Sequence, residues 1–68
     1  MSLSFKQWRL VKELTQEDMA QKIGVHVNTY RAWEKNPEEI TLKNARKIAG
    51  ALEVPPDQIF FIEEVNNV

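Results

Sequence analysis

The chain has no cysteine and only one histidine among its 68 residues. Disulfide bonds and thiolate metal sites are therefore excluded, and we expect no metal ion or other cofactor. Gly24 stands alone in its stretch, so a glycine-rich phosphate loop is missing as well. A fold of this size must then rest on the packing of its side chains.

Long apolar stretches are also missing. No run approaches the length of a membrane span, and the opening MSLSFKQW lacks the basic region and apolar core of a signal peptide. We therefore expect a cytoplasmic protein without a membrane partner. Residues 1–3 could be a remnant added to the natural chain, and they are given no functional role.

Residues suited to catalysis are scarce. His26 is the sole histidine, and a nucleophile, a base and an orienting acid would need a cleft that so small a domain can scarcely provide. No small-molecule ligand and no separate sensing domain are evident. The sequence argues against an enzyme and leaves binding as the expected class of function.

Charge is unevenly distributed along the chain. The net charge is −1, but all nine Lys and Arg lie between Lys6 and Lys47. Residues 1–47 hold nine basic and six acidic groups, a balance of +3, whereas residues 48–68 hold four acidic groups and no basic one, a balance of −4. This polarity suits a protein with one end on DNA, although ordinary surface charge is an equally good explanation.

Residues 15–34, TQEDMAQKIGVHVNTYRAWE, predict two short helices joined by a sharp corner. Thr15 is a suitable N-cap, and Gly24 supplies the left-handed backbone angle that ends the first helix. The inner face of this helix would carry Met19, Ala20 and Ile23. The second helix would begin near position 26 or 27. Its inward residues would be Tyr30 and Trp33, and its outward residues Val27, Asn28, Arg31 and Ala32.

Further helices are predicted on both sides of this pair. Ser4 can cap a first helix that ends around Lys12 or Glu13, and Thr41 can cap another over residues 42–52. The apolar stripe of the latter comprises Leu42, Ala45, Ile48, Ala49 and Leu52. Pro56 can open a short fifth helix that includes Asp57, Ile59 and Phe60. The tail, residues 63–68, has no clear period.

At these spacings the sequence resembles the Cro/C1-type helix-turn-helix family of phage and bacterial transcription regulators, over roughly residues 5–60. The landmarks of the motif are Thr15, Gln16, Ala20, Gly24, Tyr30, Trp33 and Glu34. Those downstream are Thr41, Leu42, Ile48, Ala49, Ala51, Leu52, Val54 and residues 57–60. The resemblance implies one all-α domain over residues 1–68, a compact bundle of five short helices like the lambda-repressor DNA-binding domain.

Two stretches depart from the family pattern. Glu13 stands where relatives often carry glycine, and Lys35-Asn36-Pro37 replaces the usual Asn-Gly after the second motif helix. Because a residue before proline favours extended geometry, we expect that loop to differ in shape. The family also implies a structural ion pair between Arg9 and Glu34, which would satisfy an arginine on a core face.

The resemblance implies duplex DNA as the partner. The second motif helix would enter the major groove, with Val27, Asn28 and Arg31 at the base edges. Phosphate contacts are expected from Gln16, His26 and Lys35. The alternatives are solvated polar groups at positions 28 and 31, and half-buried turn residues at positions 26 and 27.

One such domain covers a single half-site, so a homodimer is expected. Phe61 and Ile62, in a run of four apolar residues, are the candidates for its surface, with intramolecular packing as the alternative. The sequence thus predicts a small phage or bacterial transcriptional repressor. The alternative is an antitoxin-like or other protein-interaction module of the same fold with weak DNA binding or none.

Overall fold

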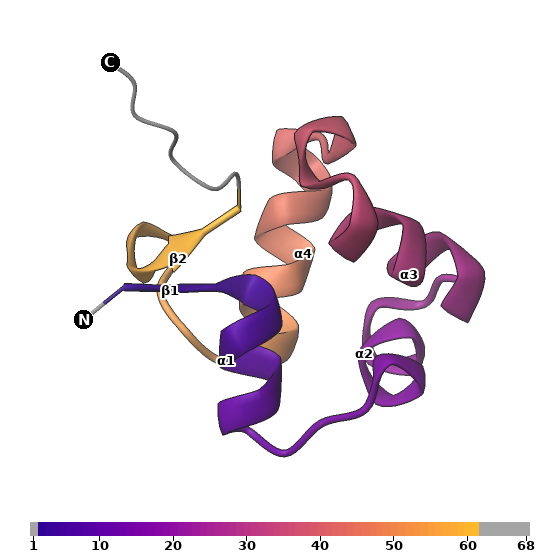
Figure 1. The fold of residues 1–68 in the computed structure, drawn as a ribbon, viewed down its shortest axis with the longest axis horizontal. Helices are drawn as coiled ribbons and strands as arrows, with labels where there is room; N and C mark the ends of the chain where they lie inside the picture. Colours follow the sequence, from indigo (N-terminus) through magenta and orange to yellow (C-terminus); the bar gives the residue numbers. More distant parts are fainter. Residues whose placement is uncertain (1, 62–68) are drawn as a thin grey trace.

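The computed structural model describes residues 2–61 and places four α-helices around one core (Figure 1). These helices are α1 (Phe5–Val11), α2 (Gln16–Ile23), α3 (Val27–Lys35) and α4 (Leu42–Leu52). Two single 3₁₀ turns follow α3 and α4, and a pair of two-residue strands joins the ends of the described chain. The smaller elements are Pro37–Glu39, Pro56–Gln58, β1 (Leu3–Ser4) and β2 (Ile59–Phe60).

The predicted helix starts are confirmed at Ser4, Thr15 and Thr41. Each side-chain oxygen accepts a hydrogen bond from the backbone amide three residues later, at 2.9 to 3.1 Å. The first two starts are capping boxes, because the side chains of Gln7 and Asp18 accept in return from the capping residue's own amide. These bonds satisfy backbone donors that a helix leaves unpaired at its first turn.

Three helices end in the same backbone motif. Just past each helix, a backbone amide reaches back to a carbonyl five residues earlier, as from Leu14 to Arg9 at 3.0 Å. This motif needs one residue with positive φ. Gly24 supplies it at 85°, as the sequence predicts, but Glu13 and Glu53 adopt it at 59° after α1 and α4. The position where the family often has glycine is thus a strained one for glutamate.

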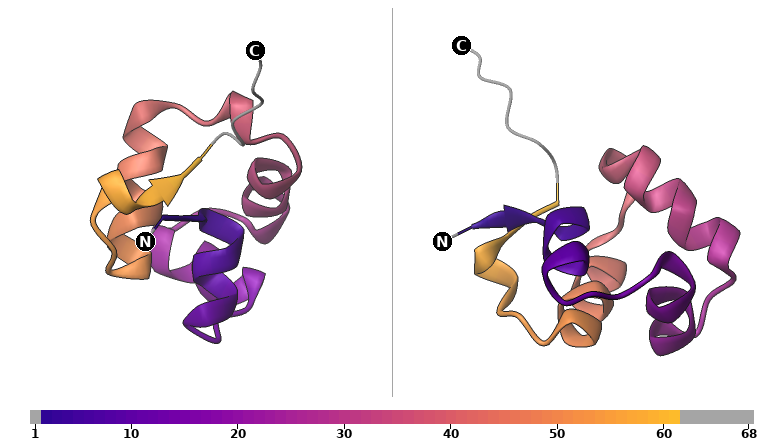
Figure 2. Two further views of the ribbon diagram at one scale, coloured as in Figure 1. Left: turned by 60° about the vertical axis from the view of Figure 1, so that its left-hand side comes forward. Right: turned by 60° about the horizontal axis from the view of Figure 1, so that its bottom comes forward.

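The core lies where α1, α2 and α3 meet α4, which contacts both α1 and α2 (Figures 1 and 2). Its buried apolar residues are Phe5, Met19, Ala20, Tyr30, Trp33, Ile48, Ala49, Leu52, Val54 and Ile59. Leu42 is an exception to the predicted stripe of α4, since 68% of it is exposed. As the first residue of the helix, it lies beyond the reach of the core.

The ends of the described chain lie side by side, away from α2 and α3 (Figure 1). β1 and β2 pair in parallel, with Leu3 opposite Ile59 and Ser4 opposite Phe60. The predicted fifth helix is therefore wrong. After one 3₁₀ turn the chain extends, so that Ile59 is buried and Phe60 is exposed, the alternation of a strand. Leu3, which was given no role, is part of this pair.

Candidate nucleic-acid interface

α2 and α3 form a helix-turn-helix whose corner is at Gly24. The backbone amides of Gly24 and Val25 both donate to the carbonyl of Ala20, at 2.8 and 3.0 Å. Val25 is half-buried and packs on the core, which fixes the angle at which the chain enters α3. A side chain at position 24 would meet no atom within 4 Å, so the demand for glycine comes from the backbone angle rather than from space.

α3 presents the outward face that the sequence predicts. Tyr30 and Trp33 are buried, whereas Asn28 and Arg31 are exposed on the second motif helix. Val27 differs, because it is half-buried and packs against the core. Only part of the Val27 side chain is therefore available to a thymine methyl group.

His26 caps the start of α3. Its Nδ1 accepts a hydrogen bond from the amide of Asn28 at 3.0 Å, a role that sequence reasoning did not assign to it. A ring nitrogen that accepts a hydrogen bond carries no proton, so Nε2 is the nitrogen left to donate. The exposed His26 ring thus keeps one donor for an outside group such as a phosphate. Lys35, at the opposite end of α3, is also exposed.

A buried ion pair joins α1 to the end of α3, as the resemblance implies. Arg9 donates from Nε to Glu34 Oε2 at 2.7 Å and from Nη2 to Glu34 Oε1 at 3.3 Å. The two side chains are only 9% and 5% exposed. Burial disfavours both charges, but their contact outweighs it: the pKa of Arg9 is raised and that of Glu34 is lowered. Arg9 also donates to the carbonyl of Leu14 at 2.8 Å, which fixes the turn before α2.

The Tyr30 hydroxyl lies in the same region, buried and without a hydrogen-bond partner among the described residues. Burial raises the pKa of the Tyr30 phenol far above its usual value, and the nearby Glu34 carboxylate raises it further.

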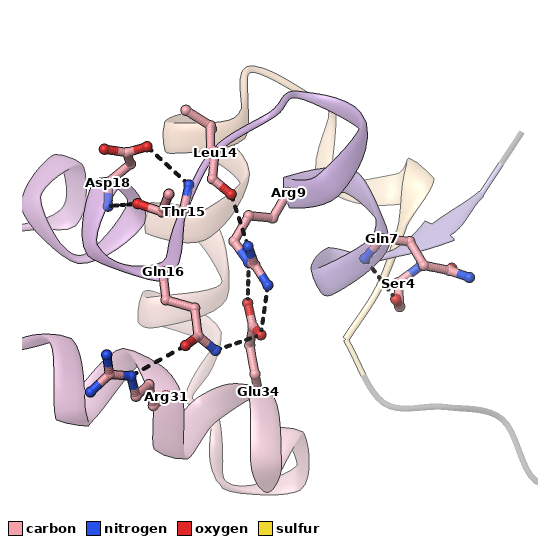
Figure 3. Close-up of polar contacts among 9 residues, drawn as sticks. All are labelled: Ser4, Gln7, Arg9, Leu14, Thr15, Gln16, Asp18, Arg31 and Glu34. Atoms are coloured by element: carbon pink, nitrogen blue, oxygen red, sulfur yellow. Dashed lines mark hydrogen bonds and ion pairs between the residues drawn. The ribbon is translucent and has the colours of Figure 1, made fainter.

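Gln16 connects this buried pair to the outward face (Figure 3). Its Nε2 donates to Glu34 Oε1 at 3.0 Å, and its Oε1 accepts from Arg31 Nε at 3.2 Å. Two residues predicted to touch DNA independently are thus in contact with each other. Gln16 still has one N–H that no residue of the described chain uses, which leaves it able to donate to a phosphate.

Glu17 is a member of the site that sequence reasoning missed. Its Oε2 lies 3.0 Å from Arg31 Nη2, and the two side chains are 64% and 48% exposed. Nothing in the spacing of the two residues indicates the contact, because they lie on different helices. Only the crossing of α2 over α3 brings them together.

Of the two residues predicted for a dimer surface, the structure describes one. Phe61 is half-buried and packs within the domain against the core, which is the alternative considered from sequence. Phe60 is 50% exposed instead. Ile62 lies outside the described residues.

Within residues 2–61, no helix is long and apolar enough to cross a membrane. The same part of the chain contains no group of three or more histidine and acidic side chains placed to hold a metal ion.

A tight helical corner, a second helix with polar residues outward and a first helix abutting it define a domain of the DNA-binding helix-turn-helix class. A family model described as "Helix-turn-helix" matches residues 5–59. The chain belongs to the Cro/C1-type helix-turn-helix family.

Two relatives extend this comparison. An uncharacterized HTH-type transcriptional regulator of Methanocaldococcus jannaschii is 41% identical over 64 residues, covering 94% of this chain and 97% of that protein. The cryptic phage CTXphi transcriptional repressor RstR of Vibrio cholerae is 34% identical over 65 residues, covering 96% of this chain but only 59% of the repressor. No solved structure is similar enough to count as a match.

Proposed function

We propose that this domain binds duplex DNA sequence-specifically and represses transcription in the cytoplasm as a small phage or bacterial regulator. The observation that carries the proposal is the shared outward face of the motif. Asn28 and Arg31 lie exposed on α3, next to Gln16 at the start of α2. A helix placed this way in the major groove can read bases while the first motif helix meets the backbone.

Each outward residue has a stated role. Asn28 pairs with adenine, Arg31 contacts guanine, and the exposed part of Val27 touches a thymine methyl group. Phosphates are contacted by Gln16, by the free ring nitrogen of His26, and by Lys35. Support comes from the names of the two relatives, a transcriptional regulator and a transcriptional repressor.

The active species is proposed to be a homodimer. One domain reads about half of a typical operator, and two recognition helices one DNA turn apart supply the remaining affinity. The exposed Phe60 at the last strand is a candidate for the contact between copies.

Selection from a random duplex library tests the proposal. We expect a pseudo-palindrome whose half-sites are about 10 bp apart, and a discrimination lower by roughly 1–3 kcal/mol at one base position in Asn28→Ala. Equal losses on selected and random DNA would reject base reading by Asn28. If the folded protein enriched no sequence, the DNA-binding proposal would be wrong.

An antitoxin-like or other protein-interaction module is the second candidate. It is favoured by the modest balance of +3 in residues 1–47 and by the carboxylate of Glu17 beside Arg31. DNA binding through phosphates weakens steeply as salt rises, whereas binding to an apolar protein surface does not. A salt titration therefore separates the two functions.

A further inference from the structure

Arg31 is held in place before any partner arrives. Each of its three guanidinium nitrogens contacts a different residue: Nε reaches Gln16 Oε1 at 3.2 Å, Nη1 reaches Asn28 Oδ1 at 3.2 Å, and Nη2 reaches Glu17 Oε2 at 3.0 Å. Two of these partners are on α2 and one is on α3. The orientation of an exposed side chain is thus set by both helices of the motif.

The contacts leave a defined part of the guanidinium free. Arginine has five N–H groups, one on Nε and two on each terminal nitrogen. With one N–H used at each nitrogen, one remains on Nη1 and one on Nη2. Two donors on neighbouring nitrogens are what a bidentate contact to O6 and N7 of guanine requires.

The acceptor that faces Arg31 is itself specified from the core. Glu34 is a carboxylate and can only accept, so the Gln16 amide must turn its nitrogen toward Glu34. Its oxygen then faces Arg31 (Figure 3). A chain of contacts therefore runs from the buried Arg9 through Glu34 and Gln16 to Arg31.

Among the described residues, Glu17 is the only charged partner of Arg31. Its carboxylate is 64% exposed on the first turn of α2, a position that repels phosphate and so does not serve general affinity for DNA. Its contact instead restrains Arg31, which Gln16 and Asn28 alone would hold only through uncharged partners. Fixing a side chain before binding removes an entropic cost of roughly 0.5–1.5 kcal/mol per residue, which is a factor of about 2 to 12 in affinity.

We propose that Glu17 is a positioning residue for sequence recognition: it holds Arg31 so that its two free N–H groups meet a guanine edge rather than phosphates. The inference rests on the proposed function, because it requires α3 in the major groove. It adds to that function a residue that sets specificity without touching a base.

The test compares Glu17→Ala with the native sequence and with a control, Asp57→Ala. The control removes the same charge from an exposed site on the last 3₁₀ turn. Affinities are measured for the selected operator and for random duplex at about 0.1 M salt, near physiological screening. For Glu17→Ala we expect operator binding to weaken about two- to tenfold and random binding to tighten about two- to fivefold. Glu17→Gln, which keeps an acceptor, should lie between. Asp57→Ala should change the ratio of the two affinities less than about twofold.

Two further measurements show whether Glu17 acts through Arg31. In an Arg31→Met background, Glu17→Ala should leave operator affinity within about twofold, since the restrained group is gone. 7-Deazaguanine lacks the N7 acceptor. When it replaces guanine at the contacted position, the native protein should lose more affinity than Glu17→Ala does.

Each contrary result has a separate meaning. Equal tightening on operator and random DNA would show that Glu17 only repels phosphate, and an undiminished operator loss in the Arg31→Met background would show that Arg31 is not involved. Either result overturns the inference alone, as does an unchanged affinity ratio in Glu17→Ala. If the native protein is folded but prefers no DNA sequence, the proposed function and this inference are overturned together.

Discussion

Phe61 is stacked on Phe5, with ring centroids 5.7 Å apart and an interplanar angle of 25°. Its neighbour Phe60 points away and is half exposed. Two adjacent aromatic residues thus have different surroundings: one completes the core of its own domain, and the other is free to contact a second molecule.

Substitutions at these two positions should have opposite effects on fold and assembly. We expect Phe61→Asp to lower the free energy of unfolding by about 2–3 kcal/mol, because it places a charge against Phe5. Phe60→Asp should change it by less than about 0.5 kcal/mol but raise the dissociation constant of the proposed dimer at least about tenfold. Urea unfolding and sedimentation velocity measure the two quantities. A protein that sediments as a monomer before substitution would reject the dimer.

The pair of Arg9 and Glu34 predicts a graded loss of stability. Arg9→Met leaves the buried carboxylate without its cation and should cost about 3–5 kcal/mol, which is comparable to the whole stability of a domain this small. Arg9→Lys keeps the charge but not the paired hydrogen bonds, so it should cost less. In urea unfolding, the native chain should be the most stable, Arg9→Lys less stable and Arg9→Met the least stable. A cost below about 1 kcal/mol for Arg9→Met would mean that the pair behaves like one on the surface.

Acid should destabilise the domain through two carboxylates. Glu34 has a lowered pKa because its contact with Arg9 and hydrogen bonds outweigh burial, and hydrogen bonds with the backbone and side chain of Thr15 lower the pKa of Asp18. Groups with a lowered folded pKa stabilise fully above their unfolded values, 4.5 for Glu34 and 3.8 for Asp18, and lose this contribution as pH falls through the folded values. The free energy of unfolding should therefore drop as pH falls below about 4.5.

Asp18→Asn provides the control for this pH dependence. It removes the contribution of one exposed helix cap. The loss of stability at low pH should therefore become smaller without disappearing. Urea unfolding at a series of pH values compares the two proteins. If both proteins lost stability with the same slope, Asp18 would have no part in the effect.

Tyr30 allows a test of its buried hydroxyl. Because no residue of the described chain forms a hydrogen bond with that group, Tyr30→Phe should leave stability within about 1 kcal/mol of the native value or raise it. The edge-on contacts of the ring with Phe5 and Trp33 are kept. A loss well above this figure, in thermal or urea unfolding, would indicate that the hydroxyl donates to Glu34 in solution.

Replacing either strained glutamate by glycine should raise the free energy of unfolding instead of lowering it. Glu13→Gly and Glu53→Gly relieve a positive φ of 59° and should each raise the free energy of unfolding by about 0.5–1 kcal/mol. Gly24→Ala does the reverse at φ 85° and should cost about 1 kcal/mol. If Glu13→Gly and Glu53→Gly both lowered the free energy of unfolding, the entropy of the unfolded chain would outweigh the strain.

Local features of the fold could be predicted from the sequence. The caps at Ser4, Thr15 and Thr41 and the corner at Gly24 depend on residues within one turn, so spacing and residue type suffice. The strand pair could not be predicted, because it joins Leu3 to Ile59 across almost the whole described chain, where local spacing carries no signal. The same applies to the site: α3's outward residues follow from periodicity, but the contact of Glu17 with Arg31 depends on how two helices cross.

The parallel pairing of β1 with β2 also affects how the domain opens. Its partners lie at opposite ends of the described chain, so forming it requires closing a loop that contains the whole helical core, whereas α2 and α3 meet through neighbouring residues. It consists of two residues a strand, and two contacts support it: Trp8 donates to the Gln58 carbonyl at 2.9 Å, and Phe61 stacks on Phe5. Amide protons of this edge should therefore exchange with solvent through a local opening that leaves the helix-turn-helix closed. Such an opening would leave the packing of α2 on α3 unchanged, and with it the surface proposed to contact DNA.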